Sequence, residues 1–162
     1  MKLKSKIIMI FLVMQLVCIF ALTGCGSSTP HIFYSLERQN IDTQLLKDYE
    51  IVCDIKGETF TGIAPCYGVI LFENEPTDFL QSFSTEKSEG FSSEKKVELE
   101  EKLEYYIDMH SDLEVPSEYL PNWDEEYMWY VSGGFDKKFY SDTLFMVYFP
   151  NDYKLVIFEM GH

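Results

Sequence analysis

The sequence predicts a single α+β domain with about five mainly antiparallel strands and one long amphipathic helix (about residues 92–110) packed on the sheet. Five runs of strand length are rich in β-branched and aromatic residues, two of them early and three late in the chain. Between these two groups lies a long segment whose apolar residues recur with the period of a helix. Because helices and strands are segregated and do not alternate, an antiparallel sheet is favoured over a parallel one.

A short amphipathic helix is expected before the first strand. Ile41, Leu45 and Leu46 have the spacing of one helical face. Asn40 or Asp42 can cap its start, because both side chains accept hydrogen bonds from the first backbone amides of a helix.

The two early runs, 49–56 and 66–73, are predicted to pair as a hairpin. The segment between them contains glycines, which favour a turn. If the strands pair symmetrically about the middle of that segment, Cys53 lies directly opposite Cys66. Pro65 cannot donate to a strand ladder, so an edge or a bulge is expected at that end.

Two helices are expected between the early and the late strands. A short one begins at 75–78, where proline occupies the first turn. After an exposed loop at 84–92, the long helix is predicted to begin at Ser92 or Ser93, either of which can cap it. Its predicted buried stripe consists of Leu99, Leu103, Tyr106, Ile107 and His110.

The last third of the chain is predicted to supply the remaining strands, at 127–132, 143–149 and 154–160. Residues 150–152 (Pro-Asn-Asp) have the chemistry of a turn between the last two. These runs are apolar on both faces, so we expect the long helix to cover one side of the sheet and other segments to cover part of the other side.

The first 25 residues have the features of an export signal. Three lysines and no acid precede an apolar run from Ile7 to Leu22, which only Gln15 interrupts. The segment ends in Leu22-Thr23-Gly24-Cys25, which resembles the lipobox of bacterial lipoproteins at all four positions. The resemblance implies that a diacylglyceryl group joins the Cys25 thiol, and that cleavage leaves Cys25 as the first mature residue.

This resemblance divides the chain into a signal peptide at 1–24, a lipidated cysteine with a short flexible tether at 25–30, and one α+β domain at 31–162. It implies a protein anchored by lipid on the outer face of the bacterial cell membrane. A retained transmembrane anchor is the alternative, but the 16-residue apolar run is shorter than the ~20 residues that cross a bilayer. A plain signal peptide would not require a cysteine at this place.

The mature chain is strongly acidic. Without residues 1–24 it has ten basic and 27 acidic residues, a formal net charge of −17. Such a charge repels nucleic acid and anionic lipid headgroups, so neither is an expected partner. Hydrophobic residues make up 46% of the sequence, which is too high for a disordered chain.

Cys53 and Cys66 are the cysteines that remain beside the lipidated one. Disulfides persist in exported domains, so a bridge between the two is a candidate, with two free thiols as the alternative. No Cys-x-x-Cys motif is present, so neither a thioredoxin-type site nor a zinc ribbon is indicated.

No metal site or cofactor is predicted. Asp108, His110, Asp112 and Glu114 form a patch rich in oxygen and nitrogen ligands. However, the glycine of an EF-hand loop is absent. We interpret the patch as the end of a helix followed by a solvated loop.

No catalytic residue is predicted either. Asp124, Glu125 and Glu126 precede a strand and could act as paired carboxylates in glycoside hydrolysis. No second carboxylate can be placed opposite them from the sequence, so an exposed acidic loop is the favoured interpretation. The chain also contains no Gly-x-Ser-x-Gly motif.

Aromatic residues gather between 119 and 140, and those in expected loops are the candidates for a binding surface. Exposed rings beside carboxylates and amides suit sugar or peptide binding. The predicted patch consists of Trp123, Phe135, Phe139 and Tyr140.

Two classes of function therefore stay open. The first is a membrane-anchored, non-catalytic binding or accessory domain of the cell envelope, whose partner is an envelope protein or a glycan. The alternative is a small envelope hydrolase that acts on glycan through carboxylates near Asp124.

Overall fold

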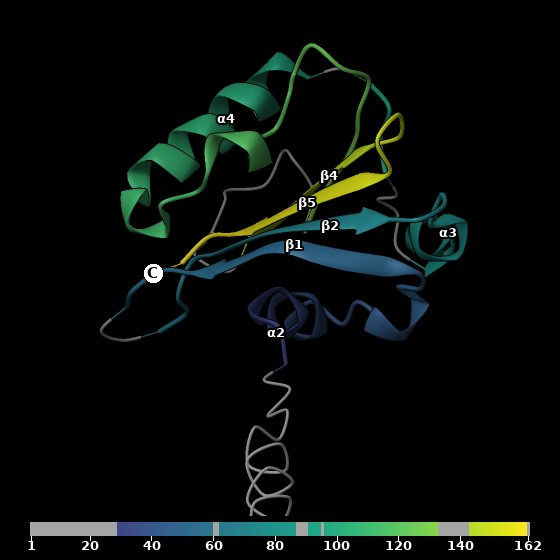
Figure 1. Ribbon diagram of the computed structural model, residues 1–162, viewed down its shortest axis with the longest axis horizontal. Helices are drawn as coiled ribbons and strands as arrows, with labels where there is room; N and C mark the ends of the chain where they lie inside the picture. The colour runs from purple at the N-terminus through teal and green to yellow at the C-terminus, as the bar shows by residue number, and fades with distance from the viewer. Residues whose placement is uncertain (1–28, 60–61, 87–90, 95, 133–142, 162) are drawn as a thin grey trace, which may run out of the picture.

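The computed structural model describes residues 29–59, 62–86, 91–94, 96–132 and 143–161, which form an antiparallel five-stranded sheet with helices on both faces (Figure 1). The helices are α2 (His31–Arg38), α3 (Thr77–Glu86) and α4 (Val97–Met109), with short 3-10 turns at Thr43–Leu45, Ser111–Leu113 and Ser117–Tyr119. The strands are β1 (Tyr49–Lys56), β2 (Cys66–Phe72), β3 (Met128–Val131), β4 (Leu144–Phe149) and β5 (Lys154–Glu159). The predicted α+β fold class is confirmed.

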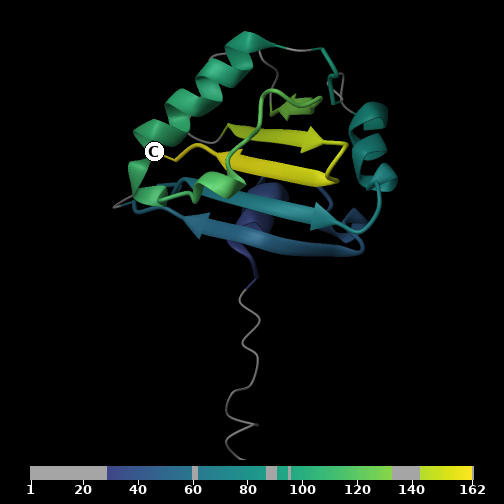
Figure 2. The same cartoon turned by 45° about the horizontal axis from the view of Figure 1, so that its top comes forward.

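The strand order is β1-β2-β5-β4-β3, and every neighbouring pair is antiparallel (Figure 2). The last hairpin, β4–β5, therefore lies between the first hairpin and β3. Strands from the two ends of the chain pair directly, since β2 and β5 are neighbours. This long-range pairing makes the early and late runs one sheet.

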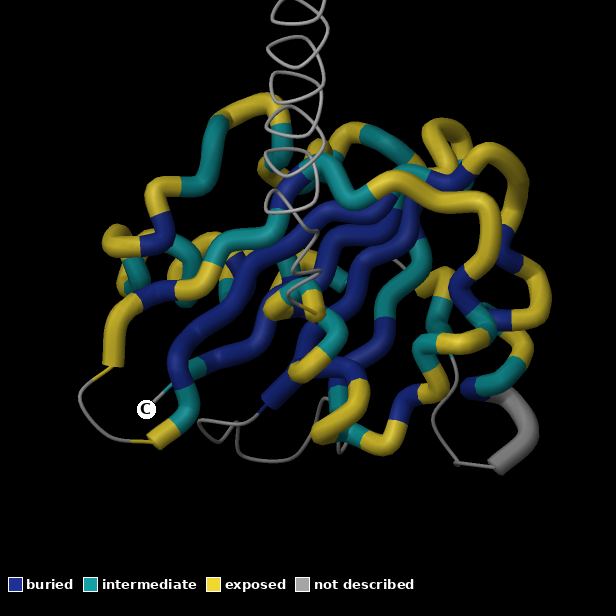
Figure 3. Tube along the Cα trace, turned by 60° about the horizontal axis from the view of Figure 1, so that its bottom comes forward, coloured by how far each residue is buried: buried dark blue, intermediate teal, exposed yellow. Residues whose placement is uncertain are grey.

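The sheet separates two hydrophobic cores. On one face, α4 packs through Leu99 and Leu103, both fully buried. On the other face, α2 packs through Ile32 and Leu36, and α3 adds Phe79 to the same core. The three central strands are thus covered on both sides, which explains why their sequences are continuous apolar runs (Figure 3).

Two predicted helices differ most from the structure. The long helix begins at Val97, because Ser92 instead pairs with Trp129 as an isolated β-bridge beside β3. The helix expected around Ile41 to Leu46 is a single 3-10 turn. Asp42 does cap that turn, accepting a hydrogen bond from the Gln44 amide at 2.9 Å, but the helix itself, α2, lies earlier.

The predicted pairing of Cys53 with Cys66 is wrong. In β1–β2, Cys53 lies opposite Val69 and Cys66 lies opposite Lys56. The register shifts between Ile51 and Cys53, where a bulge at Val52 changes the alternation of the strand. As a result, Cys53 belongs to the α4 core and Cys66 to the α2 core, and both are free thiols.

Both thiols are protected by the fold. Burial raises the pKa of Cys53 to about 11, and Asp54 and Glu118 add to the shift. Burial also raises the pKa of Cys66 to about 12, although a hydrogen bond with the Ser35 side chain acts in the opposite direction. Because the thiolate is the reactive form, neither cysteine is suited to nucleophilic chemistry at neutral pH.

A glycine lets α2 lie directly on the sheet. A Cβ atom at Gly68 would lie 2.1 Å from Cγ2 of Ile32 and 3.2 Å from the carbonyl oxygen of Cys53. Because Gly68 has no side chain, Ile32 of α2 can pack directly against β2 at this position.

An ion pair between a buried carboxylate and an exposed arginine holds the other end of α2. Glu159 of β5 is fully buried, and its Oε2 accepts a hydrogen bond from the Ser35 hydroxyl at 2.7 Å. The same oxygen lies 3.1 Å from Nη2 of Arg38. Ser35 and Arg38 are thus polar residues on a helix face that otherwise packs into the core.

Candidate functional site

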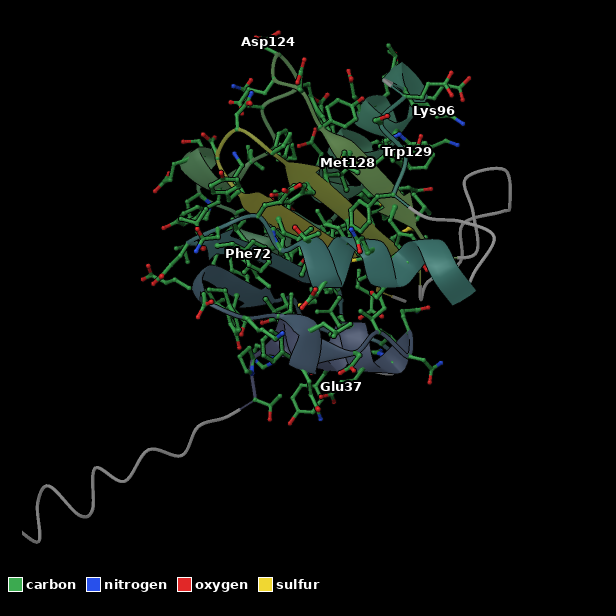
Figure 4. The ribbon with its side chains drawn as sticks, turned by 90° about the vertical axis from the view of Figure 1, so that its right-hand side faces the viewer. Glu37, Phe72, Lys96, Asp124, Met128 and Trp129 are labelled. Carbon is green, nitrogen blue, oxygen red and sulfur yellow. The ribbon has the colours of Figure 1, made fainter. Side chains whose placement is uncertain are left out.

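The described residues form a hollow of about 560 Å³ beside the start of β3. Residues 124–128 line it, together with Ser93 and Pro150. Figure 4 shows Asp124 on the turn that projects beyond the sheet, and Met128 closer to the strands. The hollow therefore combines three consecutive carboxylates with the apolar surfaces of tyrosine, methionine and proline.

Asn122 builds the acidic turn. Its Oδ1 accepts a hydrogen bond from the Asp124 amide at 3.3 Å, and its carbonyl oxygen accepts one from the Glu125 amide at 3.2 Å. Its Nδ2 also donates to Oε1 of Glu125. Glu125 is half-buried as a result, whereas Asp124 and Glu126 are exposed. The second carboxylate oxygen of Glu125 is buried without a hydrogen-bond partner in the described residues.

Tyr127, one of the residues that line the hollow, is hydrogen-bonded to α4. Its hydroxyl donates to Oε1 of Glu100 at 2.6 Å and accepts a hydrogen bond from the Lys96 amide at 3.1 Å. Burial and the bond to Glu100 raise the pKa of Tyr127 to about 12, so the phenol stays protonated at neutral pH. It serves as a fixed donor within the fold.

Of the predicted aromatic patch, the described residues place only Trp123. Trp123 is half-buried and packs against Tyr127 and Phe149, with ring centroids 5.4 and 6.4 Å apart. Phe135, Phe139 and Tyr140 lie outside the described residues. Trp123 therefore contributes to the α4 core more than to a free surface.

The four side chains of the acidic and histidine patch at 108–114 have separate surroundings. Oδ2 of Asp112 accepts a hydrogen bond from the Glu58 amide at 2.8 Å, and the His110 ring packs 6.2 Å from that of Phe158. Asp108 and Glu114 are exposed. Over the described ranges, no group of three or more His, Cys, Asp or Glu side chains is placed to hold a metal ion.

Two features were missed from the sequence. The hollow arises where Ser93, the acidic turn and Pro150 meet, and no local pattern signals that meeting. The outside of α4 also carries an apolar row, Val97, Tyr105 and Met109, each more than half exposed. Their spacing of eight and four residues, outside the predicted buried stripe, was the signal that could have identified this row.

Comparison of the chain with models of protein families, with curated proteins and with solved structures finds no match. Within the part of the chain that the structure describes, every helix is too short or too polar to cross a bilayer.

Proposed function

We propose that this protein is a lipid-anchored, extracytoplasmic domain of the cell envelope that binds a partner and does not catalyse a reaction. The observation that carries the location is Leu22-Thr23-Gly24-Cys25, which follows a basic start and a short apolar run. Among the described residues, helix α2 begins at His31, so the proposed anchor would hold the folded domain close to the cysteine.

The hollow is the proposed place of binding. Its three carboxylates favour a partner that presents ammonium or guanidinium groups, and Tyr127, Met128 and Pro150 offer apolar contact for the stem of such a side chain. Glu125 is held in place by Asn122 before any partner arrives, which lowers the entropy lost on binding. A basic envelope protein or an amino sugar with a free amine has this chemistry.

Hydrolysis of glycan is the second candidate, because carboxylates do line a hollow. In glycoside hydrolysis two carboxyl groups flank the bond, about 5–9.5 Å apart. Here the three acids are consecutive in one turn, and the other lining residues, Ser93, Tyr127, Met128 and Pro150, carry no carboxylate. This arrangement favours binding over catalysis.

Replacing Cys25 with alanine is expected to abolish lipid attachment. The protein should move from the membrane fraction to the soluble fraction, or keep its signal peptide uncleaved, because the thiol that receives the lipid is gone. Fractionation combined with intact mass tests this, with Cys53→Ala as the control that removes a different cysteine. A Cys25→Ala chain with unchanged mature mass and fractionation would disprove the anchor.

Neutralising the acidic turn is expected to weaken partner binding. The test uses the lipoprotein extracted in mild detergent as bait for envelope extract, and compares Asp124→Asn/Glu125→Gln/Glu126→Gln with the wild type. Loss of about 1.4 kcal/mol of charge-assisted bonding corresponds to a tenfold weaker association.

The matched control is Glu98→Gln/Glu101→Gln/Glu104→Gln on α4, which removes the same number of charges. An equal loss of capture in both triple variants would show that only net charge matters and would reject the hollow as the site. New reducing ends from purified cell-wall glycan, lost in the Asp124–Glu126 variant alone, would support the hydrolase instead.

A further inference from the structure

The point where the tether enters the domain is fixed by β1. Oδ2 of Asp54 accepts a hydrogen bond from the His31 amide at 2.8 Å, and Oδ1 accepts one from the Ile32 amide at 3.0 Å. The carboxylate of a neighbouring strand thus caps the N-terminus of α2, where negative charge is favourable. The first turn of α2 cannot leave the sheet without losing these bonds.

The length of chain before α2 limits how far the α2 face, meaning the side of the sheet that α2 covers, can lie from the lipid. Residues 26–30 separate Cys25 from His31. Even fully extended, these six steps span at most about 22 Å. Because α4 lies on the opposite side of the sheet, the α2 face is the one nearer to the anchor (Figure 1).

The α2 face presents aromatic rings to its surroundings. Tyr34 is 54% exposed, on the side of α2 opposite the buried Ile32 and Leu36. Tyr49, 37% exposed, meets the half-buried Phe33 edge-on, with ring centroids 5.9 Å apart. Tyrosine combines an apolar ring with a polar hydroxyl, and such rings are enriched at the boundary between water and lipid.

The charge of the chain is distributed in agreement with this orientation. Residues 97–126, which include α4 and the acidic turn, contain eleven acids and one lysine. Residues 31–50, which include α2, contain four acids and two basic residues. Figure 4 shows Glu37 and Asp124 at opposite ends of the molecule. The strongly acidic side therefore points away from the negative surface of a membrane when α2 lies against it.

The geometry points to a docked orientation, in which the domain lies on the bilayer with its α2 face and inserts Tyr34 and Tyr49 into the headgroup region. This inference rests on the proposed anchoring at Cys25. The occupant of the α2 face is the lipid surface itself, and α4 and the acidic hollow are turned outward, where a partner can reach them.

The test uses the purified lipoprotein in phosphatidylcholine vesicles, with one new cysteine at a time. Glu37→Cys on α2 and Glu104→Cys on α4 are matched, because both replace an exposed glutamate on a helix. Background labelling is low because Cys53 and Cys66 are buried. A large PEG-maleimide is expected to label Glu37→Cys about tenfold more slowly than Glu104→Cys, which corresponds to about 1.4 kcal/mol in favour of docking.

The difference should disappear when the vesicles are dissolved in detergent, and it should shrink when Tyr34→Ser/Tyr49→Ser is added to Glu37→Cys. Equal rates on vesicles would overturn the docked orientation, as would slow labelling of Glu37→Cys that persists in detergent. An unchanged rate in the tyrosine variant would overturn the insertion of the two rings. Failure of the anchor itself is recognised separately, since intact mass then shows no lipid on Cys25 and no protein floats with the vesicles.

Discussion

Replacing Arg38 with methionine should destabilise the fold by about 3–5 kcal/mol. Glu159 is fully buried, and Arg38, whose side chain is 37% exposed, brings the compensating charge to it from the surface. Without the guanidinium, the carboxylate keeps the Ser35 hydroxyl as a donor but loses its countercharge. The expected result is a lower midpoint of urea-induced unfolding with an unchanged slope.

Two comparisons separate this effect from the loss of a surface charge. Lys47 and Asp78 form an ion pair with the same 3.1 Å separation, but both side chains are exposed. Lys47→Met should therefore change stability by less than about 1 kcal/mol. Arg38→Met combined with Glu159→Met should recover most of the loss, since no unpaired charge stays in the core. A double variant as unstable as Arg38→Met would contradict the assignment.

Replacing Gly68 with alanine should cost about 3 kcal/mol, near the upper end of the usual range for overpacking. The new Cβ atom would lie 2.1 Å from Cγ2 of Ile32, so α2 would have to move away from β2. Thermal or urea-induced unfolding of the variant measures the loss.

Most of this cost should disappear once the Ile32 side chain is shortened. Ile32→Ala alone is expected to cost about 2–5 kcal/mol through the cavity it leaves. In that background, Gly68→Ala should cost less than about 1 kcal/mol, because the 2.1 Å contact is gone and only contacts of 3.2 Å, with Cβ of residue 32 and the Cys53 carbonyl oxygen, remain. The preference for alanine over glycine inside a strand, roughly 0.5–1 kcal/mol, offsets part of that cost. Simple addition of the two losses would show that Ile32 is not what excludes a side chain at position 68.

The strands were predictable because each central strand is buried on both faces. A run such as residues 144–149 must then be apolar throughout, and such a run is visible in the sequence. The buried side of α4 was equally visible, since Leu99 and Leu103 face the core at helical spacing.

What the sequence concealed were the places where a polar residue or an extra residue breaks the pattern. Ser35 and Arg38 contact Glu159, which lies more than 100 residues later in the sequence. Because of these two polar residues, the inner side of α2 does not form a hydrophobic stripe in the sequence. The bulge at Val52 moves Cys53 to the other face of β1, and no local signal distinguishes it from regular alternation. The hollow depends on three segments meeting, which only tertiary structure determines.

The proposed anchor on Cys25 would give the edges of the sheet particular importance, because anchoring concentrates copies in two dimensions and brings exposed strands together. At one edge, the backbone of Ser92 exchanges two hydrogen bonds with Trp129 and so occupies the outer side of β3. At the other edge, β1 carries the bulge at Val52 and the charged residues Glu50 and Lys56. A kinked and charged edge is a poor template for strand addition. The irregularity that separates the two cysteines thus also protects crowded copies of the domain from joining edge to edge.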